Sequence, residues 1–307
     1  MQVYTPSDEF FSGYAGESPE GLAYIDSVAV SMPFSLGDVA SQIPDEVDVR
    51  LDPKFLKEWM RTENQGGVGA CQGYGLVETV EYCFGHLTGS IVQLAPLFAY
   101  LMSQKFDGIS GDRGSTLAGG TRVLKEIGLP ELSDYPLERQ YPRGGYKAIP
   151  QSAVDAAKAG SYKTLETVRI RDAESLKAFI GSMAGIVQTG TRWTKGLADV
   201  AGHGVVTTLG GLNYGGHSWN LCGYKPIDQL GAEARRFVPR TKYDWIAIGK
   251  NSHSTRYGED GFMYLIPEFV TDLARHDQLL GRTDMGDIKP RPSAFDFTRK
   301  EHSRFSA

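Results

Sequence analysis

The hydrophobic pattern divides the chain into a helical first half and a β-rich second half. In residues 71–87, Leu76, Val80, Cys83 and Leu87 fall at helical spacing on one face, which predicts a buried helix. Similar spacing, with glycine and proline stop signals, predicts further helices at residues 95–104, 117–127, 152–159 and 173–183.

From Gly185 onward the pattern changes to short runs of β-branched and aromatic residues separated by glycine-rich turns. The predicted strands are residues 185–190, 204–209, 217–224, 243–248 and 262–266. Helices followed by strands predict an α+β protein with two lobes.

The two ends of the chain differ in composition from the middle. Residues 1–45 are rich in Ser, Gly, Pro and acidic residues, and we expect an extended arm there. Residues 281–307 are polar, which predicts a loosely held tail. The remaining main domain, residues 46–280, is expected to hold the helical lobe (about 60–150) and the β-rich lobe (about 160–270).

Composition and charge narrow the classes of partner. The net charge is −5 with no basic block, which argues against nucleic acid or an anionic membrane. No apolar run reaches the roughly 18 residues of a membrane span, and no secretory signal is visible. Three cysteines are too few for a disulfide framework, so we expect the cytoplasm or another reducing compartment. A bacterial, viral or virion-associated source is compatible with these features.

Cys71 carries the strongest chemical signal, because a glycine-rich run leads straight into it at the start of a predicted helix. A helix N-terminus favours negative charge, so we expect a lowered thiol pKa and a nucleophilic thiolate. His217 is the expected base, and Asn251 can orient its ring. Gln65 can donate its amide to an oxyanion, beside the Cys71 backbone N–H.

These residues stand in motifs that resemble those of the papain-like cysteine proteases over roughly residues 45–266. Residues 64–71 resemble the family string Asn-Gln-Gly-x-Cys-Gly-Ser-Cys, and residues 250–253 resemble Lys-Asn-Ser-Trp. Cys71 and His217 are 146 residues apart, within the roughly 130–150 residues typical of the class. Further matches in the same order are residues 43–50, 134–136, 216–218, 223–224 and 257–262.

The resemblance implies a papain-like fold, with a helical left lobe, a β-barrel-like right lobe and an active-site groove between them. It implies a thiol protease, a hydrolase that cleaves polypeptides as an endopeptidase through a thioester acyl-enzyme. The implied catalytic residues are Cys71, His217, Asn251 and Gln65. The implied substrate-binding residues are Gly114, Ser115, Thr116, Leu117, Gly216, Ser218 and His253. Neither a metal ion nor another cofactor is expected, because the usual zinc and phosphate-binding motifs do not occur.

The chain also departs from the family pattern. Val68 stands where a disulfide-forming cysteine is usual, in agreement with a reducing compartment. Gln72 and His253 each replace a tryptophan. The tryptophan at the second position normally shields the His–Asn hydrogen bond, so we expect this bond to be more exposed and weaker here.

Two alternatives to an endopeptidase remain at this stage. One is a related transpeptidase or amidase acting on peptide amides, such as cell-wall peptides. The other is a catalytically weakened binding protein with the same fold. The sequence leaves open the cleavage preference, the oligomeric state, and whether residues 1–45 occupy the groove, dock elsewhere or are removed; the arm is short for an inhibitory pro-segment.

Overall fold

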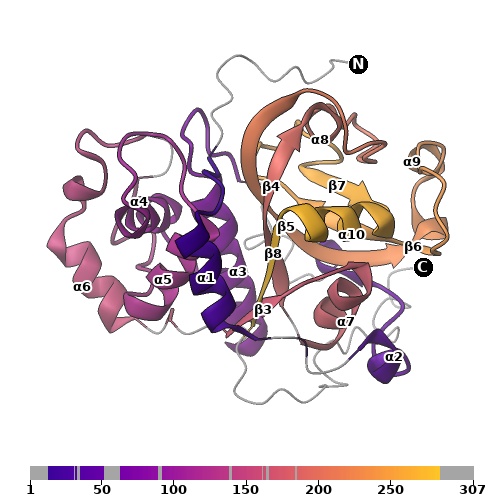
Figure 1. The fold of residues 1–307 in the computed structure, drawn as a ribbon, viewed down its shortest axis with the longest axis horizontal. Helices are drawn as coiled ribbons and strands as arrows, with labels where there is room; N and C mark the ends of the chain where they lie inside the picture. The colour runs from indigo at the N-terminus through magenta and orange to yellow at the C-terminus, as the bar shows by residue number, and fades with distance from the viewer. Residues whose placement is uncertain are drawn as a thin grey trace, which may run out of the picture.

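The computed structural model has two lobes that lie side by side (Figure 1). It describes residues 13–30, 32, 35–51, 63–88, 92–137, 140–160, 162–163, 166–183 and 185–283 of the 307-residue chain. Residues 284–307, most of the expected tail, lie outside the described part, as do residues 1–12 of the expected arm.

The helical lobe is built around one central helix. Its helices are α3 (Cys71–Thr88), α4 (Pro96–Asp107), α5 (Leu117–Glu126) and α6 (Gln151–Ala159). The predicted helices in this region are therefore confirmed. Helix α3 is buried on almost every side rather than on one face, because α4 and α5 pack on one flank and β4 and β5 on the other. Gly73 permits the approach of α4, since a Cβ there would lie 2.8 Å from the Tyr100 Cβ.

The second lobe contains one sheet whose strands run in the order β1-β3-β8-β4-β5-β6-β7, with β2 pairing on β5. The β1–β3 pair is parallel and the other pairs are antiparallel. The strands are β1 (Ala29–Val30), β2 (Val47–Asp48), β3 (Glu166–Arg169), β4 (Ile186–Thr194), β5 (Asn213–Pro226), β6 (Trp245–Lys250), β7 (Phe262–Leu265) and β8 (Gln278–Thr283). Helices α7 (Ala173–Met183) and α10 (Pro267–His276) pack on this sheet. The short helices of the described chain are α2 (Leu36–Val39), α8 (Lys195–Ala198), α9 (Ala232–Arg235), η1 (Val49–Leu51), η2 (Gly145–Ala148) and η3 (Ile227–Gln229).

The prediction of a strand at residues 204–209 is wrong. Only Val205 makes a bridge, to Tyr264, and the chain then leaves the sheet. Gly204 has φ +75°, which turns the backbone immediately before this run. Val205 and Val206 are buried in the two large hydrophobic clusters, so their hydrophobic pattern reports burial rather than a strand.

The N-terminal arm contains a helix where the sequence interpretation expected only extended chain. Helix α1 (Pro19–Val28) begins after Ser18, whose hydroxyl accepts a hydrogen bond from the Gly21 N–H at 3.0 Å. A capping serine followed by proline and glutamate is a regular start signal. Helix α1 packs on α5, and β1 then joins the sheet edge beside β3. The arm therefore bridges the two lobes (Figure 1).

Buried polar contacts fix the two lobes relative to each other. Lys250 of β6 forms an ion pair with Glu78 of α3, and both side chains are almost completely buried. Asn220 of β5 donates its amide to Glu78 at 2.6 Å and to the Gly75 carbonyl at 3.1 Å. A pair removed from water needs such additional hydrogen bonds to offset its desolvation. The contacts hold the start of α3 against β5.

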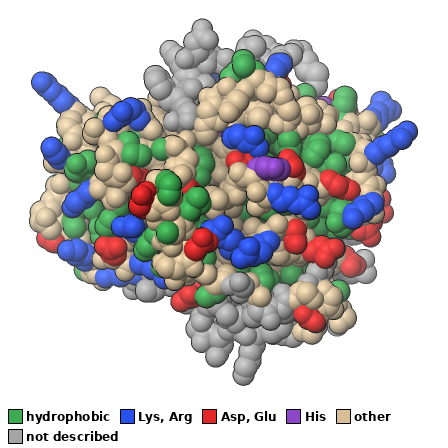
Figure 2. Space-filling model, viewed as in Figure 1, with side chains coloured by type: hydrophobic (Ala, Val, Ile, Leu, Met, Phe, Trp, Pro, Cys, Tyr) green, Lys and Arg blue, Asp and Glu red, His purple; other side chains and the backbone are tan. Residues whose placement is uncertain are grey.

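Positive and negative side chains are interspersed on the face drawn in Figure 2, so this face lacks the continuous basic surface of many nucleic-acid-binding proteins. Within the described segments, no helix combines the length and hydropathy that a bilayer span requires. Over the same residues, no three His, Cys, Asp or Glu side chains gather into a metal-binding group.

Candidate active site

Cys71 lies at the first residue of α3, at the junction between the lobes. Its side chain is fully buried, and its sulfur accepts a hydrogen bond from the Ser218 N–H of β5 at 3.2 Å. The structure therefore places the predicted nucleophile beside the residue that follows the predicted base. All three cysteines lie in described segments, and each is buried and outside any disulfide.

His217 and Asn251 are in direct contact. The His217 Nε2 and the Asn251 Oδ1 are 2.8 Å apart, and Asn251 comes immediately after β6, the strand paired with β5. An amide oxygen can only accept, so Nε2 carries the proton in this bond. The Ser252 N–H also donates to the Asn251 Oδ1 at 2.8 Å, which fixes the orientation of the amide.

The His217–Asn251 bond is shielded, contrary to the expectation drawn from the missing tryptophan. Both side chains are only 1% exposed. Trp193 of β4 packs on the His217 ring with centroids 4.5 Å apart, and the His253 ring stacks on His217 at 4.4 Å. Sequence reasoning missed Trp193, although β4 runs antiparallel to β5 and pairs Thr191 with His217.

Gln65 lies in the loop before α3 and is 3% exposed. Its Oε1 accepts from the Ser252 hydroxyl at 2.7 Å, and its Nε2 donates to the Val68 carbonyl at 2.8 Å. An amide nitrogen carries two N–H donors, so Gln65 can make this bond and still offer a second donor. The loop is tied to the asparagine segment through these contacts.

Residues 13–15 of the arm lie over the sulfur. The Gly13 N–H hydrogen-bonds to Cys71, while the Gly13 carbonyl accepts from the Ser115 N–H at 3.2 Å. The Ala15 N–H donates to the Ser115 carbonyl at 3.0 Å, and the Tyr14 N–H donates to the Gly216 carbonyl at 3.2 Å. A segment of polypeptide is thus held by backbone hydrogen bonds between Ser115 of the helical lobe and Gly216 of the second lobe.

The side chain of Tyr14 is buried against glycines of the second lobe. It is 7% exposed, and a Cβ on Gly190 of β4 would lie 2.6 Å from its ring. The Glu17 carboxylate accepts from the Leu117 N–H at 2.7 Å and the Ala118 N–H at 3.3 Å, at the N-terminus of α5. Thr116 is the N-cap of this helix and donates its hydroxyl to Asp107 at 2.7 Å. Arm residues 14–17 line a cavity of about 410 Å³ together with residues of β4, β5 and β8.

Gln72, at the position of a usual tryptophan, links α3 to the groove. Its Oε1 accepts from the Ser115 hydroxyl at 2.9 Å, and its backbone carbonyl accepts from the Gln188 amide at 2.9 Å. Gly114 has φ +80°, and a Cβ there would lie 2.9 Å from the Gly13 carbonyl group. These features set the position of the 114–115 backbone that pairs with the arm.

The expected lowering of the Cys71 pKa does not occur in this arrangement. Burial raises the pKa of the thiol to about 12, although four backbone N–H groups, among them those of Ser218 and Gly13, oppose the shift. Burial also lowers the pKa of His217 to about 4, against the hydrogen bond to Asn251. With the arm in place, the thiol and the imidazole are therefore both neutral at pH 7.

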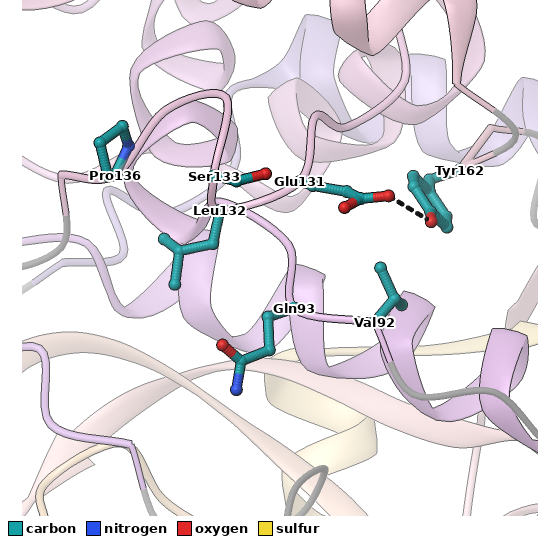
Figure 3. Close-up of a pocket in the computed structure, with 7 residues that line it drawn as sticks. All are labelled: Val92, Gln93, Glu131, Leu132, Ser133, Pro136 and Tyr162. Atoms are coloured by element: carbon teal, nitrogen blue, oxygen red, sulfur yellow. Dashed lines mark hydrogen bonds between the residues drawn. The ribbon is translucent and has the colours of Figure 1, made fainter.

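A second cavity, of about 450 Å³, lies in the helical lobe (Figure 3). Tyr162 donates to Glu131 across it at 3.0 Å. Its other lining residues are Val92, Gln93, Leu132, Ser133 and Pro136. None of the predicted site residues belongs to this cavity, which is thus separate from the groove.

Comparisons with known proteins agree on the architecture. The sequence matches no protein-family model and no curated protein. Among solved structures, xylellain, a cysteine protease from Xylella fastidiosa, matches with a TM-score of 0.65 at 18% identity over 92% of this chain and 99% of that chain. The proform of Amb a 11, a ragweed pollen cysteine protease, gives a TM-score of 0.59 at 17% identity over 89% of this chain and 75% of that chain. A Carica candamarcensis cysteine protease in complex with E-64 gives 0.55 at 19% identity over 79% of this chain and 100% of that chain. The chain has the α+β fold of the papain-like cysteine proteases, as its sequence motifs predict.

Proposed function

We propose that the protein is a cysteine-type endopeptidase. The observation that carries this proposal is the seating of a polypeptide segment across the Cys71 sulfur, between Ser115 and Gly216. A groove that pairs with peptide backbone beside a thiol and a histidine is suited to peptide hydrolysis.

In the proposed reaction the Cys71 thiol gives its proton to His217, and its sulfur attacks the carbonyl carbon of the peptide bond. The Cys71 N–H and the Gln65 amide stabilise the oxyanion. Collapse of the tetrahedral intermediate breaks the C–N bond, and His217 returns the proton to the leaving amine. His217 then takes a proton from water, which attacks the thioester and releases the acid and the thiol. Asn251 holds the His217 ring in the Nε2–H tautomer.

Under the same proposal, the N-terminal arm is a latch, that is, an inhibitory segment that covers the Cys71 sulfur and blocks the groove. The Gly13 carbonyl is held by Ser115, and it is the Gly13 N–H that is directed at the sulfur, so this residue is not presented for attack. The arm also excludes water and so keeps the reacting pair neutral. Several of the similar structures are described as proforms or precursors, which is compatible with such a role. Residues 1–45 are then the arm, 46–280 the peptidase and 281–307 a tail.

The test measures peptidase activity on an unfolded protein substrate. It compares the full chain carrying Tyr14→Ala with the full chain carrying both Tyr14→Ala and Cys71→Ala. Tyr14→Ala frees the groove, and Cys71→Ala is expected to lower activity by at least about a thousandfold, as loss of a nucleophile does. Undiminished activity in the double variant contradicts the proposal. Added amine acceptors separate the transpeptidase alternative, because a hydrolase yields mainly free acid.

A further inference from the structure

The amide of Asn251 has a second partner besides the catalytic histidine. Its Nδ2 lies 3.0 Å from the Nδ1 of His253, two residues along the chain. His253 is 9% exposed, and its ring stacks on that of His217 with an interplanar angle of 24°. His217, Asn251 and His253 therefore form one contiguous hydrogen-bonded and stacked group.

The proton positions in this group follow from the backbone. The Ser252 N–H can donate only to an oxygen, so the Asn251 atom that it contacts at 2.8 Å is Oδ1. The other amide atom is then the nitrogen, which can only donate. His253 Nδ1 must accept, and its ring proton is on Nε2. Turning the amide over would break the bonds from both Ser252 and His217.

We propose that His253 is a positioning residue for the reaction, because it accepts the Asn251 amide hydrogen and thereby holds Oδ1 on the Nε2–H of His217. The inference rests on the proposed peptidase function but assigns a role that the usual tryptophan at this position cannot have, since an indole N–H only donates. His253 also stacks on the His217 ring, but the proposed positioning acts through its hydrogen bond with Asn251.

The role has a consequence at acidic pH. A proton on His253 Nδ1 would set two donors against each other at 3.0 Å and place a second positive charge next to the His217 imidazolium. Among the described residues, the groups packed around His253 include His217 of β5, Trp193 of β4, Tyr257 of the following loop and the segment of Glu63 and Asn64. Burial and His217 lower the pKa of His253 well below 6.5, so the acceptor form prevails at neutral pH.

A purely shielding role makes different predictions. If His253 only covered the His217–Asn251 bond, an apolar side chain of similar size would replace it without loss. If it positions Asn251, an acceptor is needed at the place of Nδ1. Asparagine offers its Oδ1 there and does not titrate, so His253→Asn is the rescuing variant, while His253→Leu and His253→Phe are the apolar ones.

The experiment records the ring ¹⁵N shifts of His217 and His253 in the full chain, and then kcat and KM in the Tyr14→Ala background. In the wild type, both rings are expected in the Nε2–H tautomer. In the apolar variants, His217 should sample both tautomers and kcat should fall about tenfold with little change in KM, as for one lost hydrogen bond. His253→Asn should keep the His217 tautomer, and its kcat should remain within about threefold of the value with His253 in place. As the pH falls, this variant should lose less activity than the protein that retains His253.

Outcomes that overturn the inference are a proton on His253 Nδ1 in the wild type, or apolar variants whose His217 tautomer and pH profile match those of His253→Asn. The NMR readout needs no turnover, so it decides the role of His253 even where the activity test with Cys71→Ala fails. Two apolar variants are used so that one misfolded protein does not remove the comparison, and the wild-type tautomer is measured in any case.

Discussion

Gly13 lies directly on the Cys71 sulfur: a Cβ built on Gly13 would be 2.6 Å from Sγ and 2.6 Å from the Gly69 carbonyl oxygen. Real Cβ atoms do not approach other atoms so closely, so the arm can cross the sulfur here only through a glycine. The N–H of the same residue hydrogen-bonds to the sulfur. The closed state of the groove thus depends on one residue without a side chain.

The first prediction is that Gly13→Val undocks the arm in the full chain. Because the added side chain would overlap the sulfur and the 69 carbonyl, the rate of Cys71 alkylation by iodoacetamide should rise at least about tenfold. Ala15→Ser is the matched control, since Ala15 is exposed and keeps its backbone hydrogen bond to the Ser115 carbonyl. Equal alkylation rates in the wild type and Gly13→Val would refute the latch.

The buried ring of Tyr14 is an apolar anchor of the arm next to Cys71. Its removal in Tyr14→Ala loses roughly 2–3 kcal/mol of burial, which corresponds to an increase of about thirtyfold or more in the open population. Gly190→Ala disrupts the same contact from the second lobe, because its Cβ would lie 2.6 Å from the Tyr14 ring. Both variants should speed Cys71 alkylation and chymotrypsin cleavage of the arm, which contains Tyr and Phe but neither Lys nor Arg. A change in only one of them would mean that the ring contact is not the anchor.

Docking of the arm should weaken as the pH rises. Burial raises the pKa of Glu17 from an ordinary 4.5 to about 7, although hydrogen bonds from the Leu117 and Ala118 N–H groups lower it. The nearby Asp107 carboxyl raises the Glu17 pKa further, and burial raises the pKa of Asp107 itself to about 6. A group whose pKa is higher when docked favours docking below about pH 4.5, and this contribution is lost as the pH rises through about 7.

The measurement is the ratio of Cys71 alkylation rates in the wild type and in Glu17→Gln between pH 5 and pH 8. Since both proteins share the titration of the thiol, the ratio isolates Glu17 and should rise at least about threefold over this range. A ratio that stays flat or falls with pH would show that Glu17 does not control docking.

The buried Lys250–Glu78 pair should be important for stability. Lys250→Met leaves a buried carboxylate without its cation, which costs roughly 3–5 kcal/mol. Urea denaturation of the full chain, with exposed Lys158→Met as control, measures this loss. A Lys250→Met protein as stable as the control would mean that the ion pair makes no net contribution to stability.

The positions of the candidate catalytic residues were predictable because each stands in a short string tied to local structure. Cys71 begins a helix, and His217 and Asn251 lie on or beside two neighbouring strands, so the pairing of these strands brings the two residues together. The helices of the first lobe also follow from spacing and stop signals. Helix α1 could have been found from Ser18 and Pro19, whereas the composition of the arm masked it.

The rest depends on contacts between distant segments. Nothing in the local sequence says that Tyr14 packs on Gly190, that Glu17 binds the start of α5, or that Trp193 shields His217. The expected low thiol pKa was wrong for the same reason: it considered the helix N-terminus, while the covering arm removes water from the sulfur. Burial by a remote segment cannot be read from a motif.

The central claim is that Cys71 is a nucleophile held back by the arm, and covalent labelling tests it most directly. The full chain and Tyr14→Ala are treated with a thiol-reactive epoxide, and the site and rate of modification are followed by peptide mass spectrometry. We expect a single adduct at Cys71, formed at least about tenfold faster in Tyr14→Ala and suppressed by His217→Ala. Labelling of Cys83 or Cys222 at a comparable rate, or a Cys71 rate unaffected by both substitutions, would contradict the account.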